Sequence, residues 1–467
     1  MMIGEVSIMM QFRQEYDSLG MKEVPIDAYY GVQSLRASEN FKITGTKVHP
    51  EMIRSIVEVK QAAAIANKKS GVIEEKIADA ITKACQEILE GKFVENFIVD
   101  SIQGGAGTSL NMNANEVIAN RAIEILGGCK GDYKIVHPND HVNCGQSTND
   151  AYPSAGRIAV IRLLLKVKEQ LNSLNAAFTQ KANEYSNVIK MGRTEMQDAV
   201  PISFGQVFHA YASAIQRDIE RFTLAINEMT KLNMGGTAVG TGINADNNYI
   251  NTIVPILTEI TNLPLNQADD LVDATQNLDS FVYVSGIIKS CAATLSKISN
   301  DLRLMSSGPR TGFAEINLTP KQNGSSIMPG KINPVIPEVM NQICFNVIGN
   351  DTTITYASEA GQLELNAFEP IIFRCLFESL DTLCNGIEVF VKECVREITI
   401  NTTQCKTHLD RSIGTVTALC PYIGYNKASF LAKQALNENK NIRDIVIEEN
   451  IMPEEEIDKL LEPNNMI

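Results

Sequence analysis

The 467-residue sequence lacks an excess of positive charge, a dense set of cysteines and a long uninterrupted apolar run. Lys and Arg total 41 against 55 Asp and Glu, and the resulting formal charge of −14 repels phosphate backbones and anionic lipid. Nucleic acid and membrane surfaces are therefore poor candidates as partners. An anionic small-molecule substrate remains compatible with this charge, because a buried pocket can be locally positive within an acidic protein.

Ten cysteines are too few for a disulfide framework in a chain of this length, and no CxxC pair occurs. The five histidines lie mostly far apart, so their spacing predicts no metal site. The first residues, MMIGEVSIMMQF, carry Glu5 and lack the basic leader of a signal peptide. No window reaches about 18 uninterrupted apolar residues, the length that a membrane span needs. We therefore expect a cytoplasmic protein with reduced thiols and no transmembrane helix.

Prolines divide the middle of the chain into long segments that could be helical. Hydrophobic residues make up 44% of the sequence and charged residues 21%, values typical of a globular protein. Because proline resists placement inside a helix, the proline-free stretches predict long helices. These windows are 154–200, 202–254, 265–308, 338–369 and 371–420.

Apolar residues recur every three or four positions in three of these windows, as they do along one face of a helix. They also extend to more than one side of the expected helices, which favours a bundle that packs on copies of itself over a monomeric bundle. The three seams are Phe204, Phe208, Tyr211, Ile215, Ile219, Phe222, Ile226 and Met229; Phe281, Val284, Ile288, Cys291, Leu295, Ile298, Leu302 and Met305; and Phe373, Leu376, Leu380, Leu383, Ile387 and Phe390.

The pattern predicts three domains. Residues 1–143 mix short helical patterns with loops, residues 144–401 form the central helix bundle, and residues 402–467 form a small acidic C-terminal domain. At about 150 residues per domain, the length of the chain agrees with this division.

Two polar loops precede the long helices. In residues 103–116 three glycines allow close backbone approach, and Thr108 and Ser109 add hydroxyl groups, so the segment is either an anion cradle or a purely structural turn. In residues 137–153, Ser147, Thr148 and Asn149 stand where the first long helix begins. Free N–H groups at a helix N-terminus bind anions, and one N-cap residue would not explain the whole polar run.

Two further polar loops follow. In residues 192–201, Arg193 and Asp198 are expected to form a simple surface pair. Residues 324–334, GSSIMPGKINP, combine Ser325, Lys331 and Asn333 without an adjacent histidine or a G-x-S-x-G elbow, so a Ser-His-Asp hydrolase is not supported. A serine here could instead act as an alkoxide base, stabilised by N–H groups of its loop and a nearby cation.

The four loops together resemble those of the aspartase/fumarase superfamily. Residues 324–334, GSSIMPGKINP, match the signature loop of that superfamily. The resemblance runs from GMKEVPIDAYYGVQSLRASENF to MPEEEIDKLL. GGAGTS and NPVIPEVMNQ make the sequence more similar to aspartate ammonia-lyases than to class II fumarases, which carry TGSGTQ-like and NPTQCE-like runs. The resemblance implies a mainly α, three-domain fold with a central five-helix bundle that assembles into a homotetramer, each active site drawing on three subunits.

By the resemblance, the activity is the reversible deamination of L-aspartate to fumarate and ammonia, an anti-elimination through an aci-carboxylate intermediate with Ser325 as general base. The alternative is a class II fumarate hydratase, which converts L-malate to fumarate and water. A catalytically silent scaffold would be expected to have lost the loop chemistry. The implied substrate-binding residues are Thr108, Ser109, Ser147, Thr148, Asn149, Thr194, Glu195, Lys331 and Asn333, with Ser326, Met328 and Glu338 in support.

One position departs from the family. Relatives carry histidine or glutamine after Thr194, whereas this chain has Glu195. In the histidine-bearing relatives that ring pairs with a glutamate matching Glu338, so two carboxylates would approach here. We expect a shared proton, or a pairing of Glu195 with Lys331 or the substrate ammonium. No organic cofactor is required by the resemblance; some relatives respond to divalent metal ions, but no metal site is specified. Cys144 is interpreted as a packing residue.

Overall fold

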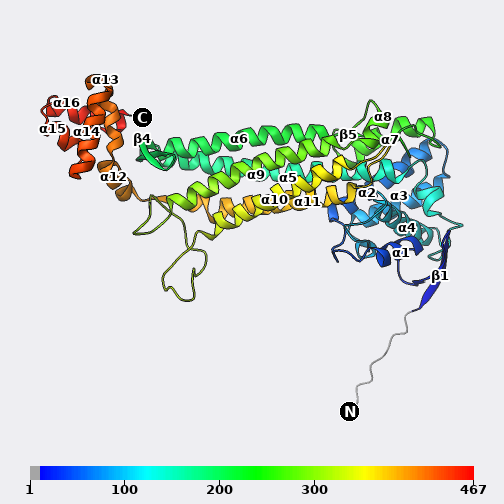
Figure 1. Cartoon of the computed structure of the whole chain (residues 1–467). Helices are drawn as coiled ribbons and strands as arrows, with labels where there is room; N and C mark the ends of the chain where they lie inside the picture. The colour runs from blue at the N-terminus through cyan, green and yellow to red at the C-terminus, as the bar shows by residue number, and fades with distance from the viewer. Residues whose placement is uncertain (1–10, 467) are drawn as a thin grey trace, which may run out of the picture. The chain divides into compact units, whose positions relative to one another are not determined.

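The computed structural model describes residues 11–466, and this part of the chain is mainly α-helical, with its strands in two-stranded pairs (Figure 1). The chain divides into two compact units, and each is described by itself. Unit 1 comprises the chain up to Val167 with Arg221–Lys289 and Asn346–Asp381, and unit 2 comprises Lys168–Glu220, Ser290–Phe345 and the chain from Thr382 onward. The predicted division into three domains stays a prediction.

In unit 1, helix α4 (Thr108–Ile125) packs against three helices from the first part of the chain, α1 (Val32–Asn40), α2 (Pro50–Lys69) and α3 (Glu75–Leu89). Inside it, the buried carboxylate of Glu116 accepts hydrogen bonds from the backbone N–H groups of Gly31, Gln33 and Ser34 at 2.8, 2.8 and 3.0 Å. These donors belong to the start of α1 and would otherwise be unsatisfied, so Glu116 fixes α1 against α4. The other elements are β1 (Phe12–Asp17), β2 (Gly20–Pro25), β5 (Lys231–Leu232), α7 (Asn247–Thr261), β6 (Asn266–Gln267) and α8 (Leu271–Gln276).

Five long helices each run through both units, and they confirm the predicted seams. Every residue of the three apolar seams is buried, with at most 9% of its surface exposed. Helical spacing of three or four therefore identified the faces that pack against neighbouring helices. The helices are α5 (Thr148–Glu184), α6 (Phe204–Met229), α9 (Asp279–Met305), α10 (Val335–Glu359) and α11 (Glu369–Glu393).

The use of prolines as helix boundaries was wrong at two positions, since Pro153 lies inside α5 and Pro255 inside α7. A proline at position 153 cannot donate to the carbonyl of Asn149 four residues earlier. That carbonyl instead accepts the side-chain amide of Asn233 at 2.9 Å. A tertiary hydrogen bond thus replaces the missing helical one, and the helix continues.

Unit 2 contains an antiparallel hairpin around residues 192–201, where the sequence had indicated a polar loop at the end of a proline-free window. Strands β3 (Ile189–Thr194) and β4 (Gln197–Ser203) pair within and just beyond the 154–200 window. Unit 2 also contains a pair of short strands, β7 (Ile316–Asn317) and β8 (Thr399–Ile400). The chain then continues with the helices α12 (Thr402–Arg411), α13 (Cys420–Ile423), α14 (Tyr425–Glu438), α15 (Ile442–Glu448) and α16 (Glu454–Leu461). The C-terminal helices share a small apolar core that includes Leu419, Leu431 and Ile445.

Within residues 11–466, α9 is long and apolar enough to cross a membrane by length and composition alone. Half of that apolar stretch is already buried in the protein. The buried seam from Phe281 to Met305 accounts for its composition, because a core helix of a bundle passes the same test.

Candidate active site

The predicted site residues fall into two groups, one in each unit. The group in unit 1, here called the anchor cluster, consists of Thr108, Ser109, Ser147, Thr148 and Asn149. Thr108 begins α4 and is exposed, and its hydroxyl donates to that of Thr148 at 3.3 Å. Ser109 is buried, and both Thr108 and Ser109 line a pocket of about 480 Å³. The structure therefore brings the first two predicted polar loops together.

Reciprocal hydrogen bonds hold the start of α5. The hydroxyl of Ser147 accepts the backbone N–H of Asn149 at 3.2 Å, and the carboxylate of Asp150 accepts that of Ser147 at 2.8 Å. The side-chain amide of Asn149 donates to the carbonyl of Ala238 at 2.7 Å. Side-chain caps of this kind satisfy the free donors of a helix N-terminus and fix the direction in which the chain enters it. Ser147 and Asn149 are thus held in place by hydrogen bonds between side chains and backbone groups.

Two buried charged side chains lie behind the anchor cluster, and the sequence reasoning missed both. Lys60 of α2 donates to the side-chain oxygens of Asn143 at 2.8 Å and Gln146 at 2.9 Å, and burial lowers its pKa to about 7, against the opposing effect of the Asp150 charge. Burial raises the pKa of Asp150 to about 6, although backbone N–H groups and Lys60 oppose the shift. The one sequence signal for Lys60 was its place just before the alanine-rich run QAAAIA, residues 61–66.

A glycine-rich loop, residues 233–242, was also missed. Its N–H groups at Gly235 and Thr237 donate to the carboxylate of Asp150 at 3.2 and 3.0 Å. The hydroxyl oxygen of Thr237 is buried and makes no hydrogen bond within residues 11–466. Buried polar groups normally have a partner, so this hydroxyl is available to a ligand or a water molecule. The run GGTAVGTG, which resembles the glycine-rich loop before α4, could have revealed it.

The second group lies in unit 2 and centres on the signature loop, residues 324–334. The hydroxyl oxygen of Ser325 accepts the backbone N–H groups of Ile327 at 3.3 Å and Met328 at 3.2 Å. The loop closes where the N–H of Gly324 donates to the carbonyl of Lys331 at 3.0 Å. A Cβ on residue 324 would lie 2.2 Å from that carbonyl oxygen, so the closure requires glycine. Asn333 adds a side-chain bond to the carbonyl of Gly324 at 3.3 Å.

Charge in the signature loop is uncompensated. Lys331 is exposed and has no ion-pair partner among the residues that the structure describes. Together with Asn333 and Glu338, it lines a pocket of about 760 Å³ in unit 2. Ser326 and Met328 are exposed on the same loop, and Glu338 lies in the first turn of α10. A cation and an amide facing a pocket beside a serine are the donors that a carboxylate substrate needs.

Thr194 and Glu195 stand at the exposed tip of the β3–β4 hairpin. Thr194 pairs with Gln197, and the two residues between them, Glu195 and Met196, have positive φ angles of 51° and 66°. This is the two-residue turn that matches the twist of an antiparallel hairpin. Within residues 11–466, Glu195 contacts neither Glu338 nor Lys331 closely enough for an ion pair or hydrogen bond, so its pairing stays a prediction.

Arg193 is not the simple surface residue that the sequence suggested. Its guanidinium is 4.0 Å from the carboxylate of Asp198 but only 2.6 Å from that of Glu315, which is completely buried. The exposed Asp198 is therefore a minor partner, and the buried carboxylate decides where the arginine points.

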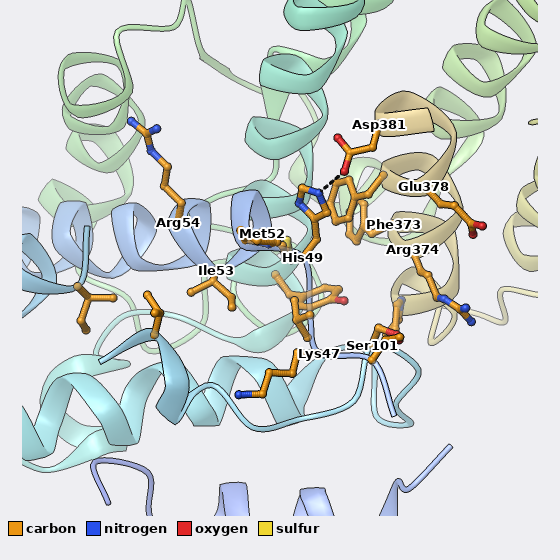
Figure 2. Close-up of a pocket in the computed structure, with 18 of the residues that line it drawn as sticks. Lys47, His49, Met52, Ile53, Arg54, Ser101, Phe373, Arg374, Glu378 and Asp381 are labelled. Atoms are coloured by element: carbon orange, nitrogen blue, oxygen red, sulfur yellow. Dashed lines mark hydrogen bonds and ion pairs between the residues drawn. The ribbon is translucent and has the colours of Figure 1, made fainter. Parts of the chain in front are cut away.

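An apolar pocket of about 880 Å³ in unit 1 contains none of the predicted site residues (Figure 2). Among its lining residues, His49 accepts the backbone N–H of Glu51 at Nδ1 and donates from Nε2 to the carboxylate of Asp381 at 2.8 Å, and the His49 ring lies beside Phe377. Met52 and Phe373 form apolar walls. Thr46, Ser101 and Tyr152 contribute hydroxyl groups to its lining, but none of them is a predicted site residue, so we assign the pocket no catalytic role. Cys144 has its pKa raised by burial, which agrees with a packing role rather than a nucleophilic one.

Known proteins resemble this chain over nearly its whole length. A family model described as "Lyase" matches residues 20–349, and one described as "Fumarase C C-terminus" matches residues 416–467. The aspartate ammonia-lyase of Bacillus subtilis is 51% identical, with 98% of this chain and 96% of the relative covered. That of Escherichia coli is 47% identical, with 97% and 96% covered.

Solved structures agree at the level of the fold. The fumarate lyase:delta crystallin of Brucella melitensis bound to cobalt is 46% identical and superposes with a TM-score of 0.95, covering 98% of this chain and 99% of that one. A recombinant class II fumarase of Schistosoma mansoni is 36% identical with a TM-score of 0.94, again covering 98% and 99%.

Proposed function

The chain belongs to the aspartase/fumarase superfamily of lyases and is a carbon–nitrogen lyase, and on that premise we propose that it converts L-aspartate reversibly to fumarate and ammonia. The names and near-complete coverage of the similar ammonia-lyases support this substrate. A class II fumarase is also similar in structure but at lower identity, so hydration of fumarate is the less favoured alternative.

The proposed base is Ser325, and its hydrogen bonds are the observation that carries the proposal. As an alkoxide, Ser325 would take a proton from the carbon beside the substrate's β-carboxylate. Two backbone N–H groups already point at its oxygen, and donors to the charged form of a group lower its pKa. The resulting aci-carboxylate dianion would then expel ammonia, the carbon–nitrogen bond breaking as the carbon–carbon double bond forms.

The dianion needs donors and a positive charge, because catalysis requires tighter binding of the intermediate than of the substrate. We assign the charge to Lys331 and the positioning hydrogen bonds to Asn333 and Thr194 and to the anchor cluster. Closure of the signature loop over substrate would exclude water and bring Ser325 within reach. Glu195 would face the substrate ammonium, which favours an amine over a hydroxyl leaving group.

We propose that the anchor cluster and the unit 2 group meet in a homotetramer in which three subunits contribute to each site. Exposed apolar residues support self-association: Phe345, Ile348 and Tyr356 of α10 are 61%, 38% and 69% exposed and share one helical face. A cytoplasmic location stays part of the proposal. Within residues 11–466 no group of three or more His, Cys, Asp or Glu side chains could hold a metal ion, so no step is assigned to one.

The test is the ultraviolet absorbance of fumarate after purified protein is mixed with L-aspartate and, separately, with L-malate. Fumarate from aspartate alone supports the ammonia-lyase proposal. Fumarate from malate alone would show a fumarase, and no fumarate from either substrate would overturn the proposed reaction.

A further inference from the structure

A buried cluster in unit 2 connects the hairpin tip to two other segments. Glu315 is completely buried, yet its carboxylate lies 2.9 Å from the ammonium of Lys190 and 2.6 Å from the guanidinium of Arg193, both on β3. His408 of α12 approaches the same carboxylate at 3.2 Å. Two positive groups of β3 and the imidazole of α12 therefore converge on one carboxylate. Burial alone would raise the pKa of Glu315, but the attraction of Lys190 and Arg193 outweighs it and lowers that pKa.

The backbone of Glu315 forms hydrogen bonds with two further segments of the chain. Its N–H donates to the carbonyl of Met305 at the end of α9, and its carbonyl accepts the N–H of Asn401, both at 2.9 Å. Ten positions further along the chain stands Ser325. Glu315 thus sits between the end of α9, the hairpin, α12 and the segment that leads to the signature loop.

Arg193 is held from several sides. Its guanidinium stacks on the ring of Phe313 at 4.3 Å, and it lies 3.4 Å from His408, which is held in turn by Gln404 at 2.8 Å. The register of the hairpin shifts between Met191 and Arg193, an irregularity of the kind that redirects side chains. Arg193 is therefore fixed, and Thr194 follows it directly in the chain.

The C-terminal region covers the other side of the hairpin. A Cβ on Gly414 would lie 2.0 Å from the carbonyl oxygen of Ala199 on β4, so the chain after α12 is in close contact with this strand. An isolated two-stranded hairpin is marginally stable in water, and it needs such contacts to present its tip in one position.

We infer that Glu315, Arg193 and His408 form a positioning cluster that fixes Thr194 at the hairpin tip for catalysis. This inference rests on the proposed function, because it assigns Thr194 a contact with substrate. Replacing a buried ion pair with apolar residues often preserves stability, so a cluster of this kind is better explained by the geometry that it imposes than by stability. Arg193 and its partners act through Thr194 and are not catalytic residues.

The experiment is a double-mutant cycle between Arg193→Lys and Thr194→Ala, with kcat and KM for L-aspartate measured on protein whose oligomeric state and thermal unfolding match the wild type. Lysine keeps the charge but cannot bond Glu315 while it stacks on Phe313. We expect Arg193→Lys to lower kcat/KM about tenfold to a hundredfold, mainly through kcat, as a displacement of about 1 Å can do. In the Thr194→Ala background, Arg193→Lys should lower kcat/KM almost no further, because the effects of residues that act as one unit are not additive.

Additive losses in the cycle would overturn the inference, since they would mean that Arg193 acts independently of Thr194. His408→Gln, which keeps a hydrogen-bonding side chain, should show the same non-additivity with a smaller loss. The matched control is Arg443→Lys: Arg443 also pairs with two carboxylates, Asp458 and Glu454, each at 2.6 Å, but in the exposed C-terminal helices. It should leave kcat/KM unchanged. Fumarate formation by the wild type together with an additive cycle would reject the positioning role alone, whereas a wild type without fumarate formation would reject both.

Discussion

The anchor cluster and the signature loop are built in opposite ways. At the anchor, side chains and backbone at the start of α5 cap one another, and buried Lys60 and Asp150 support them from behind. In the loop, Ile327 is 84% exposed and the bonds within it are few. Segments with little burial open at low free-energy cost, whereas buried networks do not. The anchor cluster, which is proposed to receive substrate, is therefore preformed, whereas the signature loop, which is proposed to carry the base, can move.

The largest expected effect comes from the chemistry of the loop. Ser325→Ala should lower kcat for L-aspartate by up to about 10⁴-fold, the upper range for loss of a general base. The free energy of unfolding should not change, because the loop adds little to the core. Steady-state assays of fumarate formation and thermal unfolding check both parts. Ser173→Ala, at a half-buried position of α5, serves as the control, and near-normal turnover by Ser325→Ala would refute the assignment of the base.

The next largest effect is expected at Lys331, the exposed cation of the signature loop. Lys331→Gln should lower kcat by about 10²–10³-fold with a smaller change in KM, because a cation that stabilises the developing dianion acts mainly in the transition state. Kinetic assays across L-aspartate concentrations separate the two parameters. The control is Lys459→Gln on exposed α16. A rise in KM with unchanged kcat would show that Lys331 only helps to bind substrate.

At the anchor cluster, the expected effect is a dependence of the free energy of unfolding on pH, because buried Lys60 lies behind it. Burial lowers the pKa of Lys60 from 10.5 to about 7, so between those pH values the unfolded chain binds more protons than the folded one. The free energy of unfolding should therefore rise with pH in that window, and Lys60→Met should remove up to about 3 kcal/mol of the rise. Asp150, with its pKa raised to about 6, titrates below the window.

Urea unfolding at several pH values from 7 to 10 measures this slope, with Lys83→Met on the exposed side of α3 as a control for the lost charge. Equal slopes for the wild type and Lys60→Met would contradict the idea that burial lowers the pKa of Lys60.

The smallest expected effect concerns the buried side chain of Asn233 behind the anchor. Asn233→Ala removes the donor to the carbonyl of Asn149 that Pro153 leaves free, together with the hydrogen bonds of the same side chain to Thr275 and Ser154, and it should lower the free energy of unfolding by about 1–3 kcal/mol. Ile327→Ser in the signature loop should change it by less than about 0.5 kcal/mol. Urea unfolding of both variants provides the comparison, which fails if the loop variant is the less stable one.

Helix faces were predictable from the sequence, whereas interruptions of the pattern were less so. The three seams are buried as predicted because a period of three to four residues depends only on local geometry. Pro153 does not end α5, since Asn233, which is 80 positions away in the sequence, satisfies the carbonyl that proline leaves free. Residues 189–203 form a hairpin where the sequence indicated only a polar loop at 192–201, because β3 and β4 pair with each other and pack against the C-terminal segment.

The candidate site shows the same division. Residues of the signature loop and of the polar run before α5 were identified from motifs, because glycine, serine and asparagine there are not required by packing. Lys60, Asp150 and the loop at 233–242 were missed because each acts through partners that are distant in the sequence. Arg193 was given the wrong principal partner, since nothing near it in the chain indicates Glu315.

The sequence by itself determined the helical faces, the family and the residue types of the proposed chemistry, because periodicity and motifs depend only on residues that are close together in the chain. Only the tertiary structure decided which charges are buried and what each one faces. The pKa shift of Lys60 and the direction of the Arg193 guanidinium both depend on burial and on contacts between distant segments, and neither quantity exists until the chain has folded.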